Sequence, residues 1–297
     1  MRLPPRSPGG AAAQPRPADY PFYRSRLGPD GRPIAWGLPD LEAFAVAHPG
    51  DPFAGRVLPG VAAPVALQLE ATGEPPVWVA LDAGELNRWA AVLARIWRRW
   101  GCAHGETIAF FDYGSSPLVL LASGSYIAYL RRGAAERLGL TTVCNDGVAS
   151  MASRMVGILQ TVKPTMLILR RDLVAPLAAA LDDAHLSLAG RLRWAAVCEP
   201  EGATTRAEVD TLAARLGLPL RRILRCDGAF LLAGDCPDCG LFHVDPGYRM
   251  QALAAGEVAV TTVFAHLCPA IGYNIGSAEI VGPKCPLEPR AQRIACG

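Results

Sequence analysis

Four residues with metal-binding side chains lie in two short segments near the end of the chain. Cys236 and Cys239 are separated by two residues, His243 follows four positions later, and Cys285 lies 42 residues beyond His243. A C-x2-C turn presents two thiolates from one loop, and zinc prefers four thiolate or imidazole ligands in a tetrahedron. The spacing predicts a structural zinc site, because four protein ligands leave no open position for a substrate. The alternative is a pair of reduced cysteines in a turn.

A second group of polar residues directly follows short apolar segments that read as strands. Asp112 and Tyr113 could act on a substrate or form the wall of its pocket, and the imidazole of His266 could serve as a general base. Further residues of these loops are candidates for substrate binding: Gly114, Ser115, Ser116, Asn145, Asp146 and Glu199. The alternatives are structural, since a serine before Pro117 can cap a helix and Asn-Asp-Gly is a turn sequence.

Residues 82–228 contain the elements that would position these side chains. Short apolar segments alternate with stretches of helical periodicity, which predicts an α/β fold, a parallel sheet with helices on both faces. The expected strands are Thr107–Phe111, Thr141–Cys144, Met166–Leu169, Trp194–Cys198 and Leu220–Leu224. The expected helices are Ala83–Trp100, Ser116–Leu138, Ala149–Val162, Leu173–Leu181 and Thr205–Leu216. Ligands bind at the carboxyl ends of such strands, where loops are expected to begin at Asp112, Asn145, Glu199 and Arg225.

The remaining segments differ from this core in composition and in hydrophobic periodicity. Residues 1–19 are rich in Pro, Ala and Arg and predict a disordered leader, and residues 20–81 predict an irregular segment that wraps the core. Residues 229–297 predict a small β-rich subdomain that contains the Cys/His cluster, with strands at Phe230–Leu232, Leu241–Val244 and Glu257–Phe264.

Composition excludes several classes of protein. The 297 residues are 51% hydrophobic and 19% charged with a net charge of +2, and no basic stripe predicts a nucleic-acid partner. The longest apolar run, Pro117–Leu130, is shorter than a bilayer span, and no apolar segment of a secretory signal follows the N-terminus, so a cytoplasmic protein is expected. Nine cysteines, an odd number, favour reduced thiols. Lysine occurs only at Lys163 and Lys284 among 29 basic residues.

Several motifs, taken in order, resemble the phenylacetate–CoA ligase branch of the adenylate-forming enzymes over roughly residues 20–296. They are "YPFYRSRL", "FFDYGSSP", "RRGAAERLGLTTVCNDG", "VCEPE", "RLGLPLRRI" and "GEVAVTTVFAHLCPAIGYNIG". In that family a carboxylate reacts with ATP to give an acyl adenylate, which CoA then attacks. The resemblance implies the large core of such an enzyme, an acyl pocket at "FFDYGSSP", and a Cys/His cluster like that of many members.

The chain departs from the family at each part that handles the nucleotide. In the stretch that matches the phosphate loop, Leu69–Pro75, Glu74 stands where the family has a lysine. Gly228 stands at the position of the magnesium-binding acid, and Ser277 at that of the ribose-binding aspartate. The family's C-terminal domain with its catalytic lysine is expected to be absent, because the chain ends at Gly297. ATP and magnesium are therefore not expected as cofactors.

Three functions remain open. The first is a repurposed enzyme that takes an aromatic or acyl group as an already activated thioester, on CoA or a carrier protein, for acyl transfer, cyclisation or condensation. The second is a non-catalytic partner of a ligase or carrier protein. The third is an adenylate-forming core completed by another chain. A homodimer is possible in each case, and neither a nucleic acid nor a membrane is an expected partner.

Overall fold

A seven-stranded sheet forms the centre of the molecule. The structure, a computed structural model, describes residues 16–69, 72–114, 116–123, 132–199, 201–263, 267–282, 285–289 and 291–296. The strand order is β4-β3-β5-β6-β8-β7, with β9 also paired to β8. The parallel strands are β3 (Thr107–Phe111), β4 (Thr141–Asn145), β5 (Met166–Arg170), β6 (Trp194–Cys198) and β8 (Leu220–Cys226). Two short strands run antiparallel to β8, namely β7 (Glu201–Gly202) and β9 (Leu231–Gly234).

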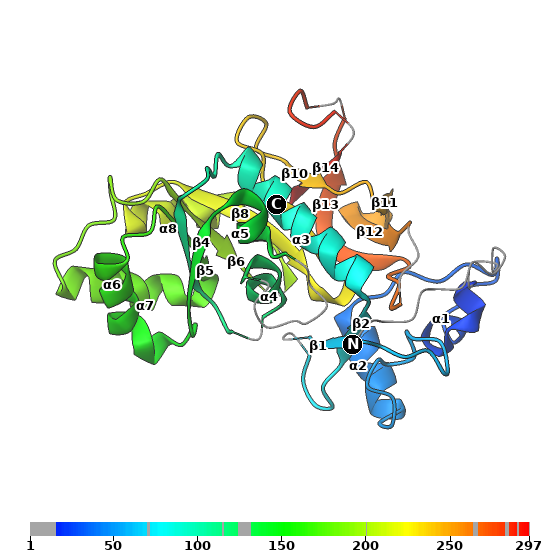
Figure 1. Cartoon of the computed structure of the whole chain (residues 1–297). Coiled ribbons are helices and arrows are strands. Elements are labelled where there is room, and N and C mark those ends of the chain that lie inside the picture. Colours follow the sequence, from blue (N-terminus) through cyan, green and yellow to red (C-terminus); the bar gives the residue numbers. More distant parts are fainter. Residues whose placement is uncertain are drawn as a thin grey trace.

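Helices cover both faces of this sheet (Figure 1). Successive side chains of a strand point to opposite faces, so in β3 Ile108 and Phe110 enter one core while Ala109 and Phe111 enter the other. One face packs on α3 (Ala83–Arg99), α4 (Pro117–Ser123) and α5 (Ala134–Leu138). The other packs on α6 (Ala152–Thr161), α7 (Val174–Asp183) and α8 (Arg206–Leu216). The predicted α/β fold class is confirmed.

The second sheet is antiparallel, with the order β10-β14-β13-β12-β11. Its strands are β10 (Phe242–Val244), β11 (Tyr248–Ala252), β12 (Glu257–Thr262), β13 (Tyr273–Ile280) and β14 (Gln292–Cys296). Helix α3 lies beside this sheet and contributes to the same core (Figure 1). Residues 20–81 contain α1 (Pro21–Arg24), α2 (Leu38–Ala47), β1 (Val65–Gln68) and β2 (Trp78–Leu81).

Four details differ from the sequence-based expectations. A single helix over residues 116–138 is wrong, because Gly133 is extended (φ −66°, ψ 167°) and α5 begins after it. A loop beginning at Arg225 is also wrong, since β8 continues through Cys226 where β7 and β9 pair with it. Pro17–Asp19 form a 3-10 helix, so the last residues of the expected disordered leader are ordered. A 3-10 turn, Ala149–Met151, precedes α6.

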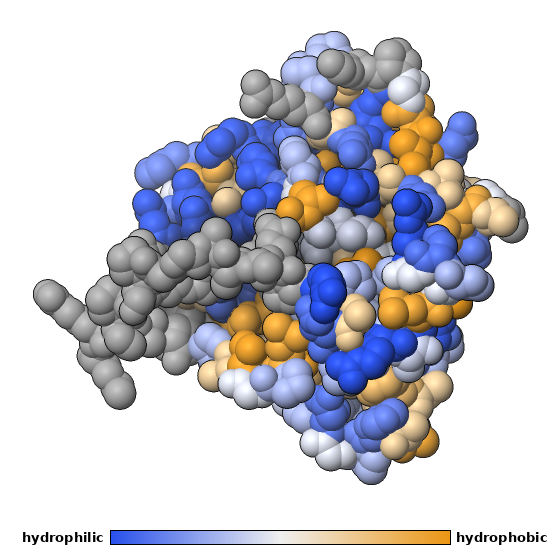
Figure 2. Space-filling view, turned by 90° about the vertical axis from the view of Figure 1, so that its right-hand side faces the viewer, coloured by the Kyte–Doolittle hydropathy of each residue, from blue (hydrophilic) through white to orange (hydrophobic). Residues whose placement is uncertain are grey.

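No described helix is both long and apolar enough to cross a bilayer. On the face turned to the viewer in Figure 2, apolar residues form several small groups separated by hydrophilic ones.

Candidate functional site

Asp112 is the first residue after β3 and is completely buried. Its carboxylate accepts hydrogen bonds from the Tyr113 backbone N–H (2.8 Å) and from the Ser116 hydroxyl (2.7 Å). A Cβ at Gly147 would lie 2.8 Å from the Asp112 Cα, so only glycine allows this close approach. The structure therefore brings together the two loops predicted to bind substrate, those after β3 and β4. Asp112 lies between them, hydrogen-bonded within the first loop and in contact with Gly147 of the second.

A buried ion pair lies beside these loops at the carboxyl end of β8. The Arg225 guanidinium donates to both oxygens of Asp227, at 2.7 and 2.6 Å, and its Nη1 lies 3.8 Å from Asp112 Oδ2. Burial raises the pKa of Asp227, the charge of Asp112 adds to the rise, and Arg225 opposes it. One arginine thus connects the end of β8 to the loop after β3.

Glu201, on β7, is a titratable group of this edge whose pKa lies near neutrality. Its carboxylate accepts hydrogen bonds from the Gly228 N–H (3.0 Å) and from the Tyr273 hydroxyl (2.7 Å). Burial raises its pKa to about 7, the nearby Asp227 charge adds to this, and the two hydrogen bonds and Arg225 oppose it. Sequence reasoning missed Glu201, because a two-residue strand carries no periodic pattern and Glu199 alone was singled out from the motif "VCEPE", which ends at Glu201.

Gly228 has no room for a side chain. A Cβ at this position would lie 2.6 Å from the Tyr273 ring, which packs directly on the turn. The position at which the resemblance implies a magnesium-binding acid is therefore covered by an aromatic ring that donates its hydroxyl to Glu201.

Arg56 approaches the same turn from the segment before β1. It is fully buried and donates from Nη1 to the Gly228 carbonyl oxygen at 2.5 Å. Its carbon Cζ lies 5.5 Å from the centre of the Trp36 ring. Its Nε and Nη2 groups have no hydrogen-bond partner within the described ranges, so two donors remain for water or a ligand.

Tyr113 and Glu199 lie at the outer part of this edge. Tyr113 is 40% exposed, and the Arg170 guanidinium stacks on its ring at 4.1 Å from the centre. Glu199 instead accepts hydrogen bonds from Arg171 (3.3 Å) and Thr204 (3.2 Å). Only one face of the Tyr113 ring remains for a substrate. The candidates Ser115 and His266 lie outside the described residues.

The turn that matches the phosphate loop already binds an acid of the chain itself. The Gly73 N–H donates to Glu42 Oε1 of α2 at 3.0 Å. The Thr72 hydroxyl donates to the Leu69 carbonyl oxygen (3.0 Å) and accepts from the Val77 N–H (3.3 Å). A carboxylate therefore holds one of the donors that a phosphate would need, and it would repel a triphosphate.

The predicted metal ligands meet in one place. The ligand atoms of Cys236, Cys239, His243 and Cys285 all lie within 4.8 Å of one another. The Cys236 and Cys285 sulfurs are 3.9 Å apart, and the Cys239 sulfur is 3.4 Å from His243 Nε2. A tetrahedron with zinc–sulfur bonds of about 2.3 Å and zinc–nitrogen bonds of about 2.0 Å gives separations of about 3.8 and 3.5 Å. The donor set and its spacing fit a tetrahedral metal ion.

A carboxylate fixes the orientation of the histidine in this cluster. His243 Nδ1 is 3.0 Å from Glu288 Oε2, so Nε2 faces the sulfurs. The same Glu288 oxygen accepts from Arg99 Nη1 of α3 at 2.6 Å. Such a carboxylate–histidine pair is typical of metal ligands, since it sets the tautomer and the ring orientation.

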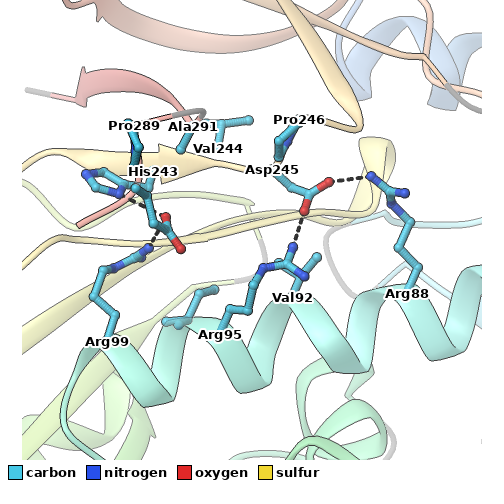
Figure 3. Close-up of a pocket in the computed structure, with 12 residues that line it drawn as sticks. Arg88, Val92, Arg95, Arg99, His243, Val244, Asp245, Pro246, Pro289 and Ala291 are labelled. Atoms are coloured by element: carbon cyan, nitrogen blue, oxygen red, sulfur yellow. Dashed lines mark hydrogen bonds and ion pairs between the residues drawn. The ribbon is translucent and has the colours of Figure 1, made fainter. Parts of the chain in front are cut away.

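An open groove of about 410 Å³ separates α3 from β10 next to this cluster (Figure 3). Asp245, which is almost fully buried, accepts hydrogen bonds from Arg88 (2.5 Å) and Arg95 of α3. Arg99 reaches Glu288 from the next turn of the helix. Three ion pairs therefore attach α3 to the segments that carry the cluster, and two of these pairs share one carboxylate.

Comparisons with known proteins show what this fold is similar to. No family model matches the chain, and no curated protein matches its sequence. The open conformation of 2-hydroxyisobutyryl-CoA ligase in complex with 2-HIB-AMP and CoA superposes with a TM-score of 0.69 at 17% identity, over 93% of this chain and 64% of that one. The same ligase in the thioesterification state gives 0.69 at 18% identity, over 93% and 62%.

A more distant likeness is to the apo structure of Mycobacterium smegmatis MbtA, with a TM-score of 0.50 at 14% identity, over 84% of this chain and 51% of that one. At these identities the likeness shows the fold alone, and this chain shares the fold of 2-hydroxyisobutyryl-CoA ligase. The chain spans less than two thirds of the length of these solved structures.

Proposed function

We propose that the carboxyl edge of the parallel sheet binds an aromatic or acyl group presented as a CoA or carrier-protein thioester. The reaction is acyl transfer, cyclisation or condensation without ATP-dependent adenylation by this chain. The observation that supports the proposal is a carboxylate with a pKa of about 7, that of Glu201, which accepts hydrogen bonds from the Gly228 N–H and the Tyr273 hydroxyl. Gly228 is the position at which the resemblance implies a magnesium ligand.

Glu201 supplies the general base in this proposal. Its ionised carboxylate takes the proton of a nucleophilic O–H or N–H as that atom bonds to the thioester carbonyl carbon. The carbon–sulfur bond then breaks, and the proton passes from Glu201 to the departing thiolate. A pKa near the working pH suits both steps, because the group must accept and then release the proton. The Nε and Nη2 groups of Arg56, which have no partner among the described residues, are buried donors on an arginine that contacts this turn.

The chain alone is expected to show no ATP–pyrophosphate exchange with any carboxylate. The Gly73 N–H is held by Glu42, and Gly228 has no space for a magnesium-binding side chain. Exchange is measured with residues 1–297 over a panel of aromatic and acyl acids, with an active CoA ligase in parallel as the positive control. Exchange that depends on both ATP and this chain would contradict the proposal.

Tyr113→Ala is expected to weaken substrate binding about fivefold without unfolding the protein. The ring is 40% exposed, so its loss costs little stability, and a lost aromatic contact is worth about 1 kcal/mol. Asp112→Asn should impair activity as well, because it removes the charge that faces Arg225. Binding of benzoyl-CoA is measured by calorimetry, and Val46→Ala, an exposed apolar position on α2, is the control. Full activity of both site variants would favour the partner-protein alternative.

We also infer that the metal of the Cys236–Cys239–His243–Cys285 cluster is zinc and that its role is structural. Three thiolates and one imidazole are a donor set that zinc prefers, and four protein ligands leave no open position.

A further inference from the structure

A small cavity lies at the opposite edge of the parallel sheet from the site described above. It has a volume of about 190 Å³, and its lining consists of Leu159, Lys163, Pro164, Leu188, Arg191 and Leu192. Leu159 belongs to α6, Lys163 and Pro164 join α6 to β5, and the other three residues precede β6. Because β5 and β6 begin here, the cavity lies at the amino ends of the parallel strands.

The walls of the cavity are apolar and its rim is cationic. Leu159, Leu188 and Leu192 are between 2% and 6% exposed, whereas Lys163 and Arg191 are exposed. No carboxylate lines the cavity, and within the described part of the chain neither cation forms an ion pair. A leucine-lined cavity with two uncompensated cations is complementary to a ligand with an apolar body and an anionic head.

Lys163 occupies a backbone position that α5 and α8 give to glycine and that α7 gives to His185, which has φ 49°. It lies beyond the last residues of α6 with φ 52°, in the left-handed region. At the ends of α5 and α8 the left-handed residues are Gly139 and Gly217, both with φ 67°. A side chain in this conformation carries a steric cost that glycine avoids. Lys163 is also one of only two lysines among 29 basic residues.

We propose that this cavity is a second binding site, for a small molecule with a single apolar ring and one anionic group. An apolar cavity of about 150 Å³ holds a benzene ring, so this volume suits one ring and no more. The ring packs on the three leucines, and the carboxylate or phosphate lies between Lys163 and Arg191. The site is separate from the thioester site, and neither proposal depends on the other.

The test uses the full chain with benzoate as probe, followed by methyl NMR of the leucines. Benzoate is expected to shift the signals of Leu159, Leu188 and Leu192, and benzamide, its neutral counterpart, to bind at least fivefold more weakly. Phenyl phosphate in place of benzoate distinguishes the two head groups. Lys163→Gly should weaken benzoate binding about fivefold, the size of one partly exposed ion pair, while the melting temperature stays equal or rises.

Arg191→Gln is the second variant, and it should weaken binding to a similar extent without touching the strained backbone. Equal binding of benzoate and benzamide, or benzoate binding that both variants leave unchanged, would overturn the proposal. Shifts confined to residues at the carboxyl edge would also overturn it, and they would leave the proposed thioester site intact.

Discussion

Removing the metal that we propose for the Cys236 cluster is expected to lower the free energy of unfolding on the order of 5 kcal/mol. Structural zinc contributes roughly 10–16 kcal/mol in zinc-finger peptides, and the loss is smaller here because α3 also packs on this region through its apolar face. The three ion pairs from α3 to Asp245 and Glu288 should loosen with the cluster. Elemental analysis before and after chelation, combined with urea unfolding, measures both effects.

Cys236→Ser is the matching variant, and Cys198→Ser is its control. Both cysteines are 1% exposed. Cys198 lies on β6, away from the cluster, and its thiol is 3.6 Å from the carbonyl oxygen of Leu169 on β5. The first variant should lose zinc and its response to chelator, and the second should keep both. A chain with well under one zinc, and with unfolding that chelator does not change, would show that the cysteines are simply reduced thiols.

Glu201→Gln is expected to slow acyl transfer about 10²–10⁴-fold, the usual contribution of a general base. The base acts when ionised, so the wild-type rate should rise with pH through about 7 and then level off. The variant should show no such step. Glu106→Gln is the control, since Glu106 directly precedes β3, at the opposite end of the strands, and binds Arg193. A pH step near 7 that persists in Glu201→Gln would assign the base to another residue.

The same substitution should change how stability depends on pH. Folding raises the pKa of Glu201 from 4.5 to about 7, so the folded state binds this proton more tightly than the unfolded chain. Its contribution is complete below pH 4.5 and is lost as pH rises through 7. As pH rises from 5 to 8, the wild type loses this contribution and Glu201→Gln has none to lose. The difference in free energy of unfolding between the two proteins should therefore shift in favour of the variant, by at most about 3 kcal/mol. Urea unfolding at the two pH values checks this sign.

The sequence predicted the features that local pattern determines. Strands β3, β5 and β6 and helices α3 and α8 lie where apolar periodicity predicted them. In the structure, the Asp82–Glu85 and Thr205–Glu208 capping boxes fix the starts of the two helices. The Cys/His cluster was also predictable, because C-x2-C spacing is a local constraint and the distant Cys285 supplied a further thiol. The grouping of Asp112 with Asn145–Gly147 followed from parallel strands ending at one edge.

Only the tertiary structure decided which carboxylate titrates near neutral pH. Asp112 stood at the expected place in the sequence, but the fold buries it completely, out of reach of a substrate, whereas Glu201 stays partly exposed. Glu201 became the candidate base because β7 places it against β8, Asp227 and Tyr273, which are remote in sequence or lie on another sheet. The pKa of a side chain depends on how far the fold removes it from water and on which charges and hydrogen-bond donors lie near it. The spacing of residues along the chain does not give these quantities.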